Sequence, residues 1–174
     1  MRRGAIVIAA LMLTLAGCRE GAKDREQPAA APEPEPPTAE QKLSEEASQA
    51  IAKLTEGDGA GKPVLSSASG LHALDLVVGS GITPLRGQTC VTNATLWLLD
   101  GTKVWSSLDT GEPFEFVLGG GQVIRGWDEG VAGMSPGGKR RLAVPPDLGY
   151  GVAGRAPVPP NAWLIFEIDL LAVK

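Results

Sequence analysis

The sequence predicts an α+β domain in which a twisted antiparallel sheet of five to six strands wraps around one short helix. Two observations predict it. From residue 71 to residue 173, short apolar stretches with alternating polar residues are separated by glycine-containing turns, as in antiparallel strands. Within this region only residues 123–134 have a helical pattern, and one helix cannot cover a flat sheet of this size unless the sheet curls around it.

Each strand is predicted from alternation or from an uninterrupted apolar run. The expected strands are residues 71–78, 89–99, 103–105, 114–118, 139–144 and 162–173. Asp100-Gly101 is a strong hairpin signal between the second and third of them. The turn Ser135-Pro136-Gly137-Gly138 is expected to end the helix. One face of the last strand is expected to carry Leu164, Phe166, Ile168 and Leu170.

Residues 1–17 have the features of a bacterial lipoprotein signal peptide. Two arginines precede an apolar run too short to span a bilayer as a helix, and Leu15-Ala16-Gly17-Cys18 resembles the lipobox, whose cysteine is lipidated and becomes the N-terminus. We therefore expect attachment to a membrane through lipidated Cys18. Because Arg19 rather than an Asp follows it, we expect an outer-membrane lipoprotein that faces the periplasm. The alternative is an ordinary secretory signal in which Cys18 is incidental.

Two segments separate this signal from the folded domain, which we place in residues 65–174. Residues 18–37 are charged, rich in Ala and Pro and free of aromatic side chains, which is typical of a solvated tether. Residues 38–64 are expected to form a short amphipathic helix and a flexible connector, with a capping box of Thr38 and Gln41 at its start. The apolar stripe is narrow, so the helix could dock on the domain, pair with a second copy or fray. We expect a monomer.

Composition and charge exclude several functions. The net charge of -4, without a long acidic or basic block, argues against nucleic acid as a partner. His72 is the only histidine, so a serine-histidine-aspartate triad would have to be built around it, but we expect it to be a surface residue of a strand. One histidine and one internal cysteine cannot form a standard zinc site, and we expect no metal and no cofactor. With Cys18 lipidated, Cys90 is the remaining thiol, and its apolar neighbours indicate a buried side chain rather than a nucleophile.

Bulky side chains and glycines gather in the second half of the chain. They occupy residues 114–119, 123–130, 146–151 and 159–166, and they supply aromatic rings, a Val-Ile-Arg-Gly-Trp stretch at the start of the helix and a tyrosine in a glycine turn. Such residues suit a dry pocket with a few polar donors. In order, spacing and identity these motifs resemble the FKBP-type peptidyl-prolyl isomerases, over about residues 71–173.

The resemblance implies an FKBP-like fold and an isomerase that acts on proline-containing polypeptides without a cofactor. It places Trp127 beneath the proline ring, and it makes the Tyr150 hydroxyl and the backbone N–H of Ile124 donors to substrate carbonyl groups. These three residues and Phe166 are the catalytic candidates. The other substrate-binding candidates are wall and loop residues: Phe114, Val123, Val158, Val104 and Trp105.

Several positions depart from the family pattern. The usual Tyr-Thr-Gly reads Ala94-Thr95-Leu96, which removes a pocket phenol, and the usual Phe-Asp reads Val104-Trp105, which removes a carboxylate. Thr110 stands where an Arg commonly pairs with that carboxylate. Trp105 would need a one-residue slip of strand register to point inward. We therefore expect reduced or altered isomerase activity.

These observations leave more than one function open. The first hypothesis is a peptidyl-prolyl cis-trans isomerase that assists the folding of exported proteins. The alternative is a catalytically decayed module that binds unfolded or proline-containing segments as a chaperone. A third interpretation is a scaffold with a partner on its outer surface, and no residue of the sequence identifies that partner.

Overall fold

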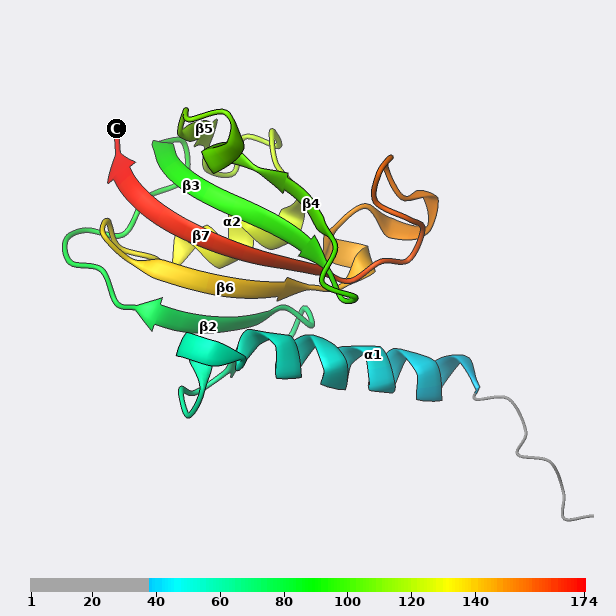
Figure 1. Cartoon of the computed structure of the whole chain (residues 1–174). Coiled ribbons are helices and arrows are strands. Elements are labelled where there is room, and N and C mark those ends of the chain that lie inside the picture. Colours follow the sequence, from blue (N-terminus) through cyan, green and yellow to red (C-terminus); the bar gives the residue numbers. More distant parts are fainter. Residues whose placement is uncertain (1–37) are drawn as a thin grey trace, which may run out of the picture. The chain divides into compact units, whose positions relative to one another are not determined.

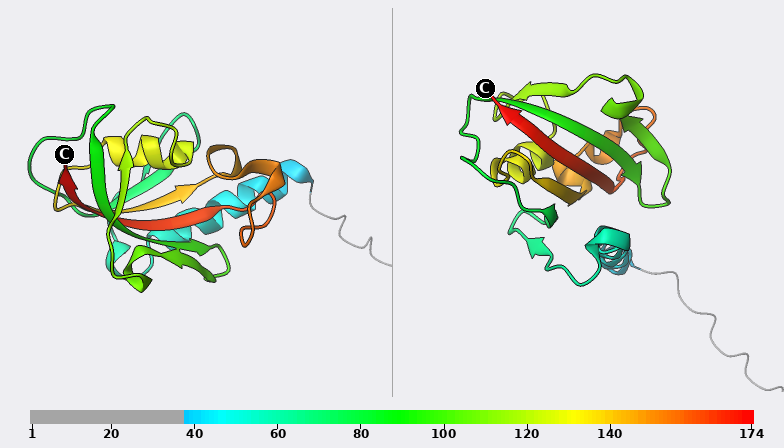
Figure 2. Two further views of the ribbon diagram at one scale, coloured as in Figure 1. Left: turned by 90° about the horizontal axis from the view of Figure 1, so that it is seen from above. Right: turned by 60° about the vertical axis from the view of Figure 1, so that its left-hand side comes forward.

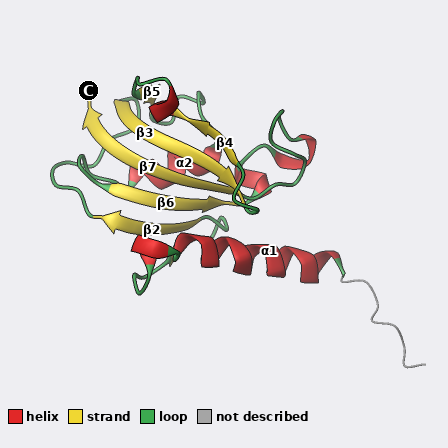
Figure 3. Ribbon diagram, viewed as in Figure 1, coloured by secondary structure: helices red, strands yellow, loops and turns green. Residues whose placement is uncertain are grey.

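The structure is a computed structural model, and it describes residues 38–174. In this part of the chain a seven-stranded antiparallel sheet is combined with two α-helices (Figures 1 and 3). The elements are α1 Ala39–Leu54, β1 Leu65–Ser66, β2 His72–Val77, β3 Thr89–Leu98, β4 Lys103–Ser106, β5 Phe114–Val117, α2 Arg125–Ala132, β6 Lys139–Val144 and β7 Leu164–Val173. The predicted α+β class is confirmed. The strand count exceeds the expected five to six because a two-residue β1 also pairs with β2.

The strands follow the order β1-β2-β6-β7-β3-β4, and β5 pairs with β3. Figure 2 shows the sheet curling around α2, while α1 lies on the opposite face. Successive side chains of a strand point to opposite faces, so Leu142 of β6 belongs to the cluster around α2 and the next residue, Ala143, to the cluster under α1. The sheet is therefore covered on both faces. No helix among residues 38–174 has the length and apolar character needed to cross a bilayer.

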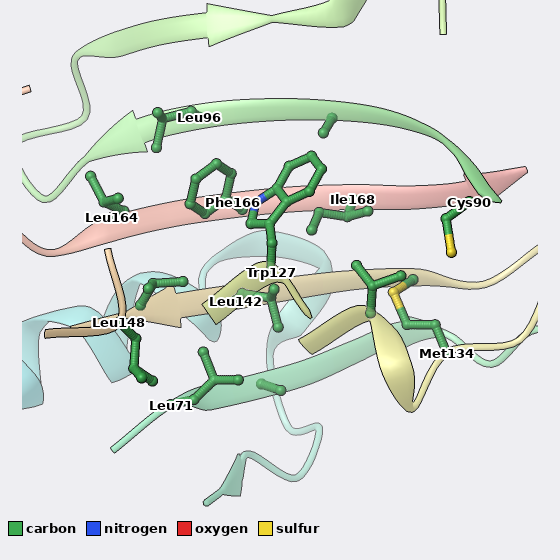
Figure 4. Close-up of a cluster of buried hydrophobic side chains, with 14 of the residues drawn as sticks. Leu71, Cys90, Leu96, Trp127, Met134, Leu142, Leu148, Leu164, Phe166 and Ile168 are labelled. Atoms are coloured by element: carbon green, nitrogen blue, oxygen red, sulfur yellow. The ribbon is translucent and has the colours of Figure 1, made fainter. Parts of the chain in front are cut away.

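The main core lies between α2 and the concave face of the sheet (Figure 4). The predicted inward face of β7 is confirmed, because all four of its residues are buried: Leu164, Phe166, Ile168 and Leu170. Two glycines allow α2 to approach β6 closely. A Cβ atom on Gly126 would lie 2.4 Å from Cγ1 of Val144, and one on Gly130 would lie 2.4 Å from Cδ1 of Leu142. A larger residue at either helix position would therefore displace the side chain of Val144 or Leu142.

The C-terminal end of α2 is attached to β6 and β2 by one buried arginine. Arg140 donates from Nε and Nη2 to the two carboxylate oxygens of Asp75, at 2.6 and 3.0 Å. Its Nη1 and Nη2 also donate to the carbonyl oxygens of Gly130, at 2.8 Å, and Gly133, at 3.3 Å. These are carbonyls at the end of a helix, which lack intrahelical donors and favour a nearby cation. Arg140 thus fixes the helix that carries the candidate site.

Helix α1 begins at the predicted capping box and docks on its own domain, which is one of the three arrangements left open by the sequence. The Thr38 and Gln41 capping box is confirmed, with hydrogen bonds in both directions. Ala50 and Leu54 are fully buried against the outer face of the sheet, so the helix docks on its own domain. Arg141 of β6 donates to the carbonyl oxygen of Leu54, at 3.3 Å, and to that of Glu56, at 2.6 Å. The outer face of the sheet thereby holds the C-terminal end of α1.

The segment that follows α1 differs from the flexible connector expected there. A 3₁₀ turn at Gly57–Gly59 is followed by β1, which pairs with β2 in antiparallel register. Lys62 donates from Nζ to the carbonyl oxygen of Leu76, and Ser69 donates to the carboxylate of Glu129, at 2.7 Å. The sequence of this segment predicted a flexible connector because it is rich in Gly and Ser. Its hydrogen bonds to β2 and to Glu129 of α2 hold it against the domain.

Candidate active site

One cavity of about 740 Å³ opens on the concave side of the sheet, at the N-terminal end of α2. Its lining contains all nine residues that the sequence analysis named as substrate-binding candidates: Val104, Trp105, Phe114, Val123, Ile124, Trp127, Tyr150, Val158 and Phe166. These residues come from β4, β5, the start of α2, the loop after β6 and β7. Segments far apart in the chain therefore meet in a single hollow. The roles assigned to the individual residues stay predictions.

Six further residues line the cavity and were not named beforehand. They are Leu96, Gly121, Gln122, Arg155, Ala156 and Pro157. Leu96 belongs to the strand predicted at residues 89–99, and the rest lie in loops without periodicity. Two features of the sequence lie near these residues, the glycine run before the helix and the loop before Pro159. Neither of them shows which side chains face the cavity.

The floor of the cavity is Trp127, which is almost fully buried. Three phenylalanine rings meet the indole edge to face, with centroid distances of 5.6 Å to Phe114, 5.5 Å to Phe116 and 5.3 Å to Phe166. The indole Nε1 has no hydrogen-bond acceptor among residues 38–174, and Figure 4 shows this nitrogen on the side of the Phe166 ring. Edge-to-face aromatic contacts hold ring orientations firmly. The floor is thus a rigid apolar surface.

The polar groups of the site lie at its rim. Ile124 is the N-cap of α2 in extended conformation, and its carbonyl oxygen accepts from the N–H groups of Trp127, at 2.9 Å, and Asp128, at 3.3 Å. Its own N–H has no hydrogen-bond partner in the described part of the chain. Asp128 in turn accepts from the N–H of Gly119, at 2.8 Å, which fixes the glycine loop beside the cavity. The N–H of Ile124 is therefore free to donate to a bound carbonyl group.

Tyr150 lies across the cavity, between two short 3₁₀ turns, Pro146–Leu148 and Gly151–Ala153. The chain continues as a tight loop in which Arg155 and Val158 exchange backbone hydrogen bonds, at 3.0 and 2.6 Å. Val158 is buried against the core, although its backbone belongs to the loop. The guanidinium carbon of Arg155 lies 5.8 Å from the centre of the Tyr150 ring, within the range of a cation–π contact.

Val104 and Trp105 of β4, two positions predicted to depart from the family pattern, line the cavity. Leu96 pairs with Trp105 and Trp97 with Lys103, so the register shifts at this point and Val104 is left without a partner. This bulge supplies the one-residue slip that the sequence analysis required for Trp105 to point inward. The Trp105 ring is 37% exposed and meets the Phe114 ring edge on, at 5.7 Å. An indole therefore forms the wall at the position where a carboxylate was expected from the family pattern.

Ala94 and Thr110, two further predicted departures, do not line the cavity. Ala94 is 2% exposed in the middle of β3, and its N–H donates to Oγ of Ser107, at 3.0 Å. Thr110 ends a short 3₁₀ turn, where its hydroxyl donates to the carbonyl oxygen of Ser107, at 2.8 Å. The Thr110 hydroxyl therefore serves the local turn rather than the site.

Cys90, His72 and the acidic side chains are the groups to consider for nucleophilic or metal chemistry. Burial, and secondarily the Asp128 carboxylate, raises the pKa of the Cys90 thiol, so this group stays protonated near neutral pH. His72 lies on β2, where its ring stacks on Trp163 with a centroid distance of 6.0 Å. Residues 38–174 contain no group of three or more His, Cys, Asp and Glu side chains arranged to hold a metal ion. What the cavity offers is an aromatic floor, the N–H of Ile124 and the hydroxyl of Tyr150.

A curled antiparallel sheet on a short helix, with an aromatic cavity between them, defines an α+β domain with one apolar hollow at the start of that helix. The family model described as FKBP-type peptidyl-prolyl cis-trans isomerase matches residues 80–171. The chain belongs to this family.

Relatives and solved structures agree with that assignment. The chain is 50% identical to an FK506-binding protein of Neisseria meningitidis serogroup B over 105 residues, which cover 60% of this chain and 96% of the relative. It is 45% identical to the peptidyl-prolyl cis-trans isomerase Fkbp12 of Drosophila melanogaster over 107 residues, 60% of this chain and 99% of the relative.

Two solved structures share the fold. AtFKBP13 is similar with a TM-score of 0.62 and 35% identity, over 64% of this chain and 99% of that chain. FkpA from Escherichia coli is similar with a TM-score of 0.62 and 38% identity, over 78% of this chain and 64% of that chain.

Proposed function

We propose that this protein catalyses the cis-trans isomerisation of X-Pro bonds in polypeptides. The supporting observation is the cavity of about 740 Å³ with Trp127 as its floor and a backbone N–H of Ile124 free at its rim. Rotation about an X-Pro amide has a barrier of about 18–20 kcal/mol because the amide loses resonance when it twists. A dry cavity disfavours the polar planar amide, and fixed donors favour the twisted one, so the barrier falls without a covalent step.

The proposed roles follow from position. Trp127 supports the proline ring from below, and Phe166, whose ring lies 5.3 Å from the indole, closes one side. The N–H of Ile124 and the hydroxyl of Tyr150, both residues of the lining, donate to substrate carbonyl groups. A hydrogen bond can be stronger to the twisted amide than to the planar one. If the difference is about 1.4 kcal/mol, that hydrogen bond multiplies the rate by about ten.

We also propose that the substrates are exported polypeptides and that the protein is an outer-membrane lipoprotein facing the periplasm. The support is the signal sequence of residues 1–17 and the lipobox ending at Cys18, both outside the described residues. Lipidation at Cys18 would anchor the domain at a membrane surface. The tether of residues 18–37 would then join this anchor to a monomeric isomerase domain.

The test is an exchange measurement on an X-Pro peptide by NMR, with the purified full-length protein. We expect cis-trans exchange to be faster with the protein than without it. The uncatalysed exchange has a time constant of roughly tens to hundreds of seconds. Tyr150→Phe should lower kcat/KM about three- to tenfold, because it removes one hydrogen-bond donor. Trp97→Phe is a matched aromatic control, because Trp97 packs against the cluster under α1 and does not line the cavity. Exchange at the buffer rate by a folded protein would refute the proposal.

One structural observation favours a second candidate function, a module that binds unfolded or proline-containing segments without efficient catalysis. The wall at Val104 and Trp105 is entirely apolar, whereas catalysis in related pockets was expected to involve a carboxylate there. Such a wall would still hold apolar side chains. Suppressed aggregation of a proline-free client protein, unchanged in Trp127→Phe, would favour this function over isomerisation.

A further inference from the structure

The cavity contains a single formal charge. Among the described residues that line it, Arg155 is the only ionisable side chain that is charged near neutral pH, and no Asp, Glu or Lys takes part. The lining also includes the apolar side chains of Val104, Trp105 and Phe114. Any substrate that enters this hollow therefore meets one positive charge and no negative one.

Arg155 is held at the rim by its backbone and by an aromatic ring. Its N–H and carbonyl group are both hydrogen-bonded to Val158, and Gly154 before it has φ +65 with a Cβ position 2.7 Å from the backbone N of Pro160. These contacts restrict the backbone conformation of the loop. The guanidinium group lies over Tyr150, a proposed donor to the substrate. A cation at this place is close to the atoms that flank a bound proline.

The charge of Arg155 is not neutralised within the described chain. Its side chain is exposed and has no carboxylate within salt-bridge distance among residues 38–174, whereas the buried Arg140 is paired with Asp75. Asp128, which lies at the base of the glycine loop, accepts from the N–H of Gly119. The guanidinium group therefore keeps donors available for an anion that arrives with the substrate.

We propose that Arg155 forms an anion subsite at the rim, so that the protein selects X-Pro bonds with an acidic residue next to the proline and disfavours those with a basic one. The proposal rests on the proposed isomerase function and names its substrate class. A carboxylate beside the proline can pair with the guanidinium group, which offers planar donors to carboxylate oxygens. A lysine or arginine in the same place is repelled, and no acidic residue of the lining compensates.

The expected selectivity is modest because the subsite is exposed. Exposed ion pairs in water contribute little, so a Glu peptide should exceed its Gln isostere about threefold in kcat/KM. Attraction of Glu and repulsion of Lys act together, so the Glu peptide should exceed the Lys peptide about tenfold. Both ratios should approach one in 1 M salt, because the Debye length there falls to about 3 Å.

The experiment uses the purified full-length protein and two sets of short peptides. One set carries Glu, Gln or Lys directly before a proline, and the other carries them directly after it. Exchange rates and dissociation constants are measured by NMR for every peptide at 0.05 M and 1 M salt. The Glu-to-Gln ratio is compared for the parent chain, Arg155→Lys, Arg155→Gln and Arg125→Gln. Arg125 is a matched control, because it is exposed and does not line the cavity.

The proposal predicts a Glu-to-Gln ratio above two in one of the two sets, retained in Arg155→Lys and Arg125→Gln and lost in Arg155→Gln. Equal ratios for Glu, Gln and Lys at low salt, or a preference that survives in Arg155→Gln, would overturn it. If no peptide is isomerised faster than in buffer, the isomerase proposal fails by itself. The ratios of dissociation constants then still decide whether Arg155 selects acidic segments.

Discussion

Replacing Arg140 by methionine should strongly destabilise the domain, because this side chain joins three elements. Its guanidinium group makes two hydrogen bonds to Asp75 of β2 and two to carbonyl groups at the end of α2, while its own strand is β6. The side chain is 10% exposed and that of Asp75 is 30% exposed. In Arg140→Met the apolar stem remains, but a mostly covered carboxylate and two helix carbonyls lose their donor.

The magnitude follows from burial. Removing one partner of a buried ion pair costs about 3–5 kcal/mol, because the other charge stays behind without compensation. The Asp75 carboxylate keeps some contact with water, which places the loss near the lower end, at about 3 kcal/mol. That loss changes the ratio of folded to unfolded protein about 150-fold, and it should lower Tm by roughly 10 °C in a domain of this size.

Urea unfolding measures this loss, and a double-mutant cycle with Asp75→Asn assigns it. The double variant should lose less than the sum of the single variants, since neither partner is then left charged and alone. Lys174→Met is the control, because its ion pair with Glu115 has side chains 60% and 48% exposed and should contribute less than about 0.5 kcal/mol. A loss in Arg140→Met no greater than that of the control, or a strictly additive cycle, would refute the reasoning.

Three further outcomes are expected. Trp105→Asp should raise kcat/KM about tenfold in the peptide exchange assay, and a folded variant without any rise would show that this position was misassigned. Burial lowers the pKa of His72 below its usual 6.5, so the unfolded chain binds this proton more tightly. The free energy of unfolding should therefore fall as the pH drops below about 6.5, and His72→Gln should flatten this part of the pH profile; an unchanged profile would argue against it. Cys18→Ser should move the protein from the membrane fraction to the soluble fraction of cells, and retention in membranes would count against the lipid anchor.

Sequence patterns located the strands well where burial is one-sided and local. β6 was predicted at its observed bounds, Lys139–Val144, and β7 was predicted with its inward face because apolar residues recur at every second position. The helix was predicted over 123–134 but spans Arg125–Ala132. Its start is later because Ile124 adopts an extended conformation as N-cap, and its end is earlier because Gly133 leaves the helical conformation.

The site was predicted from motifs, and its missing parts are those that depend on backbone detail. Trp105 could be placed only after the bulge at Val104 was visible, because alternation alone assigns a strand residue to the wrong face when the register shifts. Arg155 lies in a loop where neither periodicity nor the resemblance assigns a direction to a side chain. Its position follows from two backbone hydrogen bonds to Val158 and from the ring of Tyr150.

The docking of α1 is indicated in the sequence by apolar residues on the outer face of the sheet. An antiparallel sheet with one solvated face carries polar residues at the outward positions. Here the outward positions include Leu74, Ala143 and Ile165, which would expose a continuous apolar surface if nothing covered them. The narrow, alanine-rich stripe of α1 suits this surface, because Ala50 allows the helix to approach closely and Leu54 fills the remaining space. The second face of the sheet therefore makes residues 39–64 part of the folded domain rather than a spacer before it.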